Sequence, residues 1–88
     1  MQTARDRVLA ELVRQLQDNV EGLEDLQIAD LALDKTFKDL GASSLDMVEV
    51  VSSMMSRLGV AVNRTAFARL KNLGELVDLF AAELQKST

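Results

Sequence analysis

Apolar side chains recur with the period of an α-helix between residues 40 and 58. The main stripe repeats at intervals of three or four residues and comprises Met47, Val50, Val51, Met54 and Leu58. One such stripe is enough to bury a helix in a small bundle. A second, narrower apolar line on a neighbouring face comprises Leu45, Val48 and Met55. Because a core does not need this second line, we expect it to form an exposed strip that contacts a partner.

The start of this helix is marked by polar and turn-forming residues. Gly41 breaks the chain, Ser43 is a good N-cap, and Asp46 stands where a capping-box partner belongs. Ser44 then occupies the first helical position, and Gly59 is a natural stop at the other end. The Ser44 hydroxyl would lie at the positive end of the helix, where backbone amides and the helix dipole favour a phosphate ester.

A first helix is predicted from a cap at Thr3 to about Leu16 or Asp18. Its apolar face comprises Val8, Leu9, Leu12, Val13 and Leu16, with Val20 just beyond.

Residues 19–42 form a long, predominantly acidic segment that predicts a loop. Loops of this length are unusual in compact domains, so we expect spaced apolar residues to pin it to the helices. These anchors are Leu23, Leu26, Ile28, Leu31, Leu33, Phe37 and Leu40. The acidic residues lack the ligand spacing of a calcium loop, which favours a solvated surface over a metal site.

Two further helices are predicted after a short extended link at residues 60–62. The first spans about residues 66–70, with Asn63 or Thr65 as its cap, and buries Phe67 and Leu70. The last begins after a cap at Asn72, and residues 85–88 are expected to fray. Its buried face comprises Leu73, Leu76, Val77, Phe80 and Leu84. The expected fold class is all-α, a small four-helix bundle with three longer helices, one short helix and a single domain over residues 1–88.

Composition excludes several kinds of function. The 88 residues include no cysteine and no histidine, so no Ser-His-acid triad and no common zinc or thiol site can be built. We therefore do not expect an enzyme. The net charge of −4 disfavours nucleic acid as a partner. There is no apolar run typical of a signal peptide or a membrane span, so we expect a cytoplasmic protein that does not bind membranes.

The sequence around the two serines resembles a known family. Residues 40–49, LGASSLDMVE, are similar to the leucine-glycine-x-aspartate-serine-leucine-aspartate segment of acyl carrier proteins, and Phe37, Leu40 and Gly41 match the turn before it. The resemblance implies the bundle of that family, with a long first loop, and a covalent 4′-phosphopantetheine arm on Ser44. Ser43 departs from the aspartate that the family usually has there, which leaves open which serine is modified.

A narrower resemblance concerns residues 60–62, Phe67 and residues 70–80, which look like the discrete donor carriers of polyketide β-branching cassettes. This implies an acetyl group donated to an HMG-CoA-synthase-like enzyme. The helix over residues 44–58 has only two acids, and the region after it is basic through Arg57, Arg64, Arg69 and Lys71. A partner would therefore need apolar and acidic features. The residues expected to dock it are Leu45, Asp46, Val48, Glu49, Met55, Arg69 and Lys71.

Other partners and roles stay open at this point. The resemblance implies a phosphopantetheinyl transferase, an acyl-loading enzyme and an HMG-synthase-like or ketosynthase partner, with the carrier itself a monomer. One alternative is a generic type II fatty-acid or polyketide carrier, or a peptidyl or aryl carrier. Another is a helical binding module with no prosthetic group, which the mass after coexpression with a transferase would distinguish.

Overall fold

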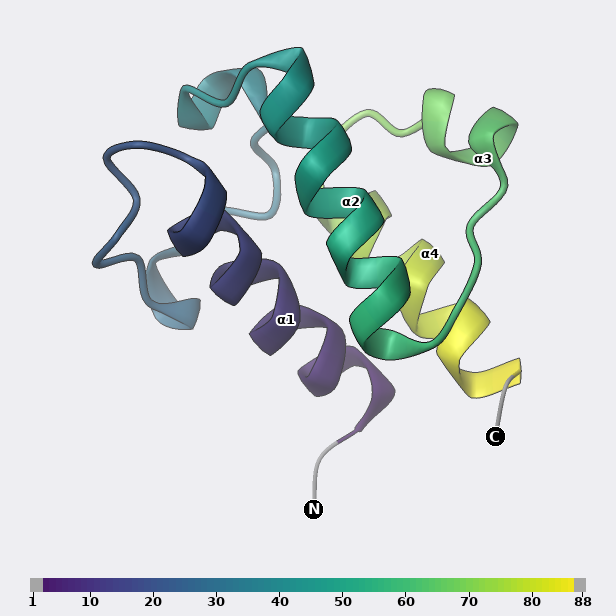
Figure 1. Cartoon of the computed structure of the whole chain (residues 1–88). Coiled ribbons are helices and arrows are strands. Elements are labelled where there is room, and N and C mark those ends of the chain that lie inside the picture. The colour runs from purple at the N-terminus through teal and green to yellow at the C-terminus, as the bar shows by residue number, and fades with distance from the viewer. Residues whose placement is uncertain (1–2, 87–88) are drawn as a thin grey trace.

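The computed structural model describes residues 3–86, and this part of the chain is helical without strands. The α-helices are α1 (Ala4–Asn19), α2 (Ser44–Leu58), α3 (Arg64–Ala68) and α4 (Leu73–Lys86), and two 3₁₀ turns, η1 (Ile28–Asp30) and η2 (Lys38–Leu40), lie in the loop after α1. Figure 1 shows α1 and α2 side by side in front of α4, with the short α3 at the outer edge of α2. The predicted all-α class, with three longer helices and one short helix, is confirmed.

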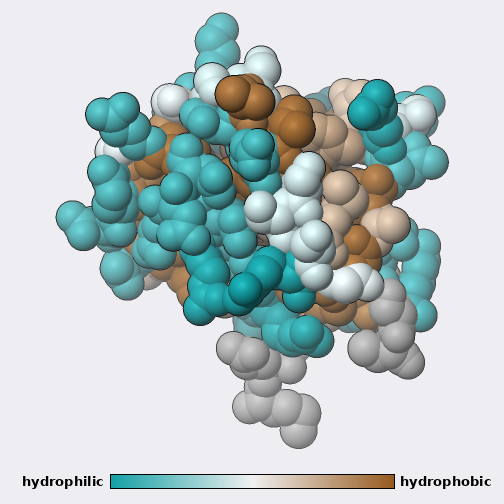
Figure 2. Space-filling model, viewed as in Figure 1, coloured by the Kyte–Doolittle hydropathy of each residue, from teal (hydrophilic) through white to brown (hydrophobic). Residues whose placement is uncertain are grey.

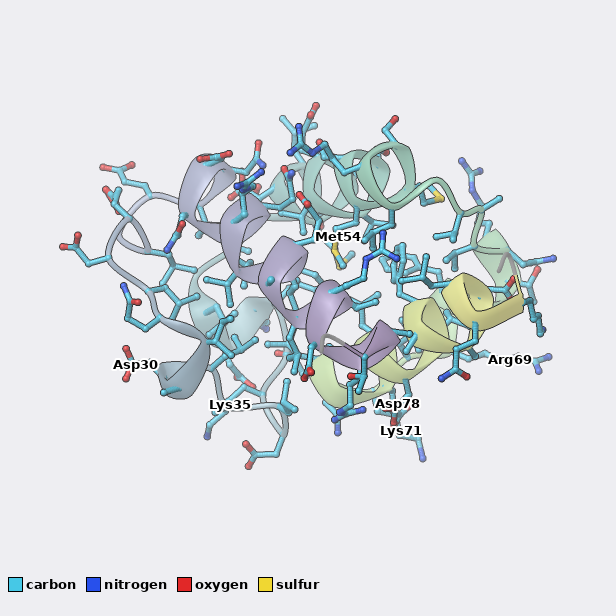
Figure 3. All side chains as sticks on the ribbon, turned by 90° about the horizontal axis from the view of Figure 1, so that it is seen from below. Asp30, Lys35, Met54, Arg69, Lys71 and Asp78 are labelled. Atoms are coloured by element: carbon cyan, nitrogen blue, oxygen red, sulfur yellow. The ribbon has the colours of Figure 1, made fainter. Side chains whose placement is uncertain are left out.

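The core lies where α1 meets both α2 and α4. Each of these helices contributes one apolar stripe to it, and Met54 of α2 points into the centre of the bundle (Figure 3). The largest fully buried side chains are Phe80, Leu12, Leu16, Met54, Leu73, Leu76, Val8, Val50 and Val77. The predicted buried face of α4 is confirmed at every position, and that of α1 at all positions except Leu9, which is half-buried.

Local caps set the limits of α1. Thr3 and Asp6 form a capping box, in which the Asp6 amide donates to Thr3 Oγ1 at 3.1 Å. The helix continues to Asn19, slightly further than predicted, because the Asn19 side chain binds the Gln15 carbonyl at 2.9 Å and extends the last turn. Gln15 is buried, which the pattern did not indicate, and its amide donates to Glu11 Oε2 at 2.7 Å.

The long loop is held partly by its apolar residues and partly by α4. Leu31 is buried as predicted, whereas the prediction of Ile28 as an anchor is wrong because this side chain is 49 % exposed on η1. Backbone bonds supply the missing attachment, since the Gly74 amide donates to the Leu33 carbonyl at 2.8 Å and the Leu73 amide to the Lys35 carbonyl at 2.9 Å. A Cβ at Gly74 would lie 3.2 Å from the Leu33 carbonyl oxygen, a tight contact that a larger residue could make only if the loop moved by a few tenths of an ångström.

The predicted limits of α3 are wrong by two residues. It spans Arg64–Ala68 rather than 66–70, because Asn63 is the cap and its Oδ1 accepts from the Thr65 amide at 2.7 Å. Phe67 and Leu70 were expected to be buried but are half-buried, since α3 lies outside the tight packing of the three longer helices.

The start of α4 matches the prediction, and the Asn72 side chain accepts from the Glu75 amide at 2.9 Å. The predicted fraying from residue 85 is wrong for Gln85 and Lys86, which are helical, and residues 87–88 lie outside the described range. Within that range, no helix combines the length and the apolar character needed to cross a membrane.

Candidate functional site

The chain enters α2 through a tight turn that includes η2. The Ala42 amide donates to the Phe37 carbonyl at 3.0 Å, and Gly41 has a φ of +82°, a left-handed conformation that favours glycine. The pKa of the Asp39 carboxyl group lies below its ordinary value. The main cause is a hydrogen bond from the Thr36 backbone amide, and the second is a hydrogen bond with the Thr36 side chain. Ser43 follows this turn, has an extended backbone conformation and caps α2.

Ser43 and Ser44 have different surroundings although they are adjacent. Ser43 is the N-cap: its Oγ accepts from the Asp46 amide at 3.1 Å, and its own amide donates to Asp46 Oδ2 at 3.0 Å. Ser44 is the first residue of α2 and is exposed. Within the described residues, its hydroxyl has no hydrogen-bond partner. The capping predictions at Ser43, Asp46 and Gly59 are confirmed.

The outward side of α2 carries the two most exposed large apolar side chains of the described chain. Leu45 is 70 % exposed and Val48 is 54 % exposed. Figure 2 shows hydrophilic surface over α1 and a hydrophobic patch over the first part of α2. Asp46 is engaged in the capping box, while Glu49 is exposed beside this patch. The expectation of an exposed apolar strip is confirmed for Leu45 and Val48.

The expectation is wrong for Met55, the third member of that strip. Met55 is half-buried and packs against the core. Its Sδ accepts a hydrogen bond from the Val62 amide at 3.4 Å. The link between α2 and α3 folds back over this part of α2 and covers it, which the local spacing of residues could not indicate.

The four basic residues that the sequence grouped together do not form one cluster. Arg57 faces α1, where its Nε lies 3.8 Å from Glu11 Oε1. Arg69 and Lys71 are exposed at the junction between α3 and α4, on the outside of the molecule (Figure 3). Arg64 is the first residue of α3 and lines a groove beside α2. The predicted third-helix basic region is therefore correct for Arg64, Arg69 and Lys71 and wrong for Arg57.

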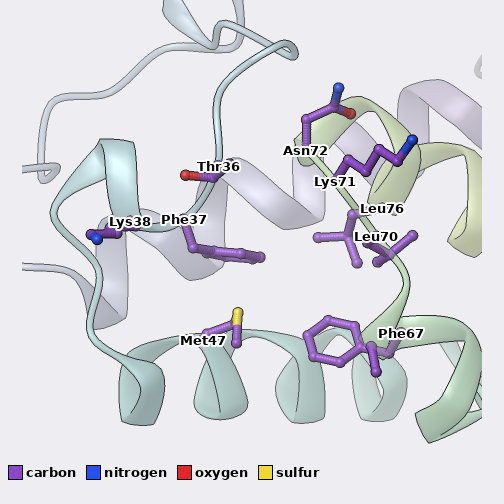
Figure 4. A pocket seen from close by; sticks show the side chains of 10 residues that line it. Thr36, Phe37, Lys38, Met47, Phe67, Leu70, Lys71, Asn72 and Leu76 are labelled. Carbon is purple, nitrogen blue, oxygen red and sulfur yellow. The ribbon is translucent and has the colours of Figure 1, made fainter.

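An apolar cavity of about 270 Å³ opens between η2, α2, α3 and the start of α4. In Figure 4, Phe37 and Met47 face Phe67, Leu70 and Leu76 across it. Met47 lies three residues after Ser44, so one wall of the cavity belongs to the first turn of α2. The sequence pattern indicated these side chains only as core residues, because the cavity forms from four separate segments and has no local signal.

This geometry suits a covalent group on Ser44. An exposed, unpaired hydroxyl at a helix N-terminus is accessible to a modifying enzyme, and the helix dipole stabilises the negative charge of a phosphodiester there. The apolar cavity and the exposed strip lie on either side of the same helical turn. The fold and site thus suit a small helical protein with a covalently attached group on the serine at the start of α2.

Comparison with known proteins supports this class and identifies the family. Residues 14–80 match the phosphopantetheine attachment site family. The chain is also 32 % identical over 63 residues to an acyl carrier protein of Thermotoga maritima, an alignment that covers 72 % of this chain and 75 % of that protein. No solved structure was found to match.

The chain belongs to the phosphopantetheine-binding acyl carrier protein family. Its cofactor is covalently attached 4′-phosphopantetheine. Like other members, it is a carrier and has no catalytic activity of its own.

Proposed function

We propose that Ser44 carries the 4′-phosphopantetheine and that the protein donates an acetyl group from it to an HMG-CoA-synthase-like enzyme in polyketide β-branching. When attached, the arm supplies a terminal thiol that holds an acyl group as a thioester. Tethering raises the local concentration of that group at a docked enzyme, and the carrier itself need not touch the reacting atoms. The protein would act by delivery alone.

The observation that supports Ser44 is the difference between the two serine hydroxyls. The Ser43 hydroxyl accepts the Asp46 amide and belongs to the capping box, whereas the Ser44 hydroxyl is exposed and unpaired within the described chain. A phosphodiester at Ser43 would disrupt the cap and cost roughly 1 kcal/mol of helix stability. At Ser44 it would leave both hydrogen bonds of the box intact.

The test is the mass gained on incubation with coenzyme A and a phosphopantetheinyl transferase. We expect Ser44→Ala to abolish the gain and Ser43→Ala to retain it, with a somewhat lower Tm from the lost cap. Far-ultraviolet circular dichroism checks that both variants stay helical. Modification of Ser44→Ala but not of Ser43→Ala would move the site by one residue and overturn the assignment.

The donor role rests on the narrower resemblance and on the charge of the surface. Asp46 and Glu49 are the only acids of α2, and Arg69 and Lys71 are exposed beyond α3. If partner choice depends on these charges, specificity lies in the difference between partners rather than in overall affinity. The alternative is a generic type II fatty-acid or polyketide carrier, whose partners include a ketosynthase and an acyl-loading enzyme.

Acetyl donation to a purified β-branching synthase distinguishes these roles. We expect the acetyl-loaded protein to donate efficiently and an acidic fatty-acid carrier with the same acetyl group to donate poorly. Replacing Arg69 and Lys71 with Glu should reduce donation while leaving the modification of Ser44 unchanged, because rim charges act mainly on encounter and selectivity. Equal donation by both carriers would leave only the generic role.

A further inference from the structure

Two polar pockets lie between α1 and α2, the helices that stand side by side in Figure 1. The first, of about 240 Å³, is lined by Arg7 and Arg14 of α1 and by Arg57 near the end of α2, and we call it the arginine pocket. The second, of about 280 Å³, adjoins it because Arg57 lines both. The arginine pocket shares no lining residue with the apolar cavity or with the groove between α2 and α3. It is therefore a separate feature of the surface.

The arginine pocket is strongly basic in a protein that is acidic as a whole. The chain has a net charge of −4 and six arginines, and three of the six line this pocket. The single carboxylate that lines it within residues 3–86 is that of Glu11. Three positive charges thus face one negative charge, which leaves an excess of positive charge for an acidic ligand to neutralise.

The carboxylate of Glu11 is already engaged in holding α1 against α2. Its Oε2 accepts from Gln15 Nε2 at 2.7 Å, and its Oε1 lies 3.8 Å from Arg57 Nε. Arg7 and Arg14 are each about one helical turn from Glu11, a spacing that allows ion pairs on a helix. Both are nevertheless exposed, and neither forms an ion pair within the described chain. The fold therefore accounts for Arg57 but not for the other two guanidinium groups.

We propose that the arginine pocket binds an acidic segment of a second protein, whose carboxylates pair with Arg7, Arg14 and Arg57. Guanidinium groups suit this role because they bind carboxylates through two parallel hydrogen bonds. Arg7 and Arg14 are seven residues apart on α1, which corresponds to about 10 Å along the axis. This spacing fits carboxylates distributed along a peptide segment better than it fits one small anion.

The adjoining pocket extends the same binding surface with neutral polar groups. It is lined by the hydroxyl groups of Ser52, Ser53 and Ser56, and none of these forms a side-chain hydrogen bond within residues 3–86. Hydroxyl groups can donate to the carbonyl groups of a bound segment and accept from its amides. The sequence has no acidic residue between Glu49 and Glu75, so this half of α2 does not repel an acidic ligand.

The position of the pocket gives it a function distinct from contact at the arm. Arg57 is thirteen residues after Ser44 on α2, about 20 Å along the helix axis. A protein bound at the arginine pocket therefore leaves Ser44 accessible, so that one protein holds the carrier while an enzyme acts on the arm. Such tethering raises the local concentration of the carrier near that enzyme. This part of the inference rests on the proposed attachment at Ser44.

Two synthetic peptides test the binding. They have the same sequence except that one carries glutamate, and the other glutamine, at four positions spaced by three or four residues. Each is titrated into the ¹⁵N-labelled, unmodified full chain at low ionic strength. We expect the glutamate peptide to shift the backbone amides of Arg7, Glu11, Arg14 and Arg57 and to bind about tenfold more tightly than the glutamine peptide. Added salt should reduce this difference, because the ion pairs are exposed.

A double variant, Arg7→Gln with Arg14→Gln, should lose most of the preference for the glutamate peptide. Arg69→Gln with Lys71→Gln is the matched control, since both residues are exposed beyond α3 and the change in net charge is the same. It should keep the preference. The inference would be overturned by equal binding of the two peptides, by shifts confined to other surfaces, or by an unchanged preference in the first double variant. Inorganic phosphate that binds the same residues as tightly as the glutamate peptide would also overturn it, by making the pocket a site for small anions.

The tethering role is tested by repeating the titration on the chain that carries the arm. We expect the affinity for the glutamate peptide to stay within about twofold of that of the unmodified chain, because the two sites are far apart. A tenfold loss would show that arm and peptide exclude each other and would refute the role. Peptide binding at the arginine pocket with no transferase product at Ser44 would refute the attachment site and leave the pocket standing. Modification of Ser44 without preferential peptide binding would do the opposite.

Discussion

The two faces of α2 both carry apolar side chains, but one face is buried in the core and the other is exposed to solvent. On the inner face, Val50 and Met54 are completely buried against α1 and α4. On the outer face, Leu45 and Val48 are more than half exposed, one turn or less from Ser44. Valine occurs on both faces, so hydrophobicity alone does not tell which residue stabilises the fold. The side chains that stabilise the fold are the ones that the packing of α2 turns toward its neighbouring helices.

The contrast has a functional meaning. Exposing two large apolar side chains next to each other forgoes the stabilisation that their burial would give, about 1.5–3 kcal/mol each. The core of this small protein is already complete without them. Exposed apolar surface of this kind, close to Ser44, suits a carrier that docks on other proteins.

The largest expected effect is at the inner face. Met54→Ala should lower the free energy of unfolding by about 2–5 kcal/mol, because a fully buried side chain is lost and a cavity remains. For a domain of this size, that corresponds to a fall in Tm of roughly 8 °C or more. Urea denaturation of wild type and variant measures the effect. A change smaller than about 1 kcal/mol would mean that the two faces of α2 have been exchanged.

An intermediate effect is expected at Met55, which separates the two faces. The sequence predicts an exposed side chain, whereas the structure has it half-buried beneath the link to α3. Met55→Ala should therefore cost about 1–2 kcal/mol, because only part of the side chain leaves a packed environment. Thermal denaturation beside Met54→Ala provides the comparison. A cost as large as that of Met54→Ala would place Met55 in the core.

Sequence patterns predicted the features of this fold that depend on neighbouring residues. The cap at Thr3, the capping box at Ser43, the stop at Gly59 and the cap at Asn72 all involve side chains and amides within a few positions of each other. The inner stripe of α2 was predicted for the same reason at Val50, Val51 and Met54, whereas its two outer members, Met47 and Leu58, are only half-buried. In five-residue α3, two candidate caps were equally plausible from sequence, and the limits were misplaced.

The features that were missed depend on distant parts of the chain. The hydrogen bond from Val62 to Met55, the ion pair of Arg57 with Glu11 and the bond of Gly74 to Leu33 join different elements. No periodicity in the sequence contains this information. The same holds for the candidate site: the position of Ser44 at the helix start was predictable, whereas the groove and the cavity beside it were not.

The smallest expected effect on stability is at the outer face, and there it should be accompanied by a large effect on function. Val48→Ala removes a side chain that is 54 % exposed, so the free energy of unfolding should change by less than about 0.5 kcal/mol. If Val48 contacts the partner, its truncation should weaken acyl transfer by about 1–3 kcal/mol, or roughly 5- to 150-fold in kcat/KM. Val50→Ala is the matched control, because Val50 is fully buried one face away on the same helix. It should cost about 2 kcal/mol in stability and, at a temperature where it remains folded, leave transfer nearly unchanged. Transfer kinetics and denaturation curves of the two variants together test the comparison. Equal transfer rates for Val48→Ala and wild type would show that the exposed strip of α2 does not dock the enzyme.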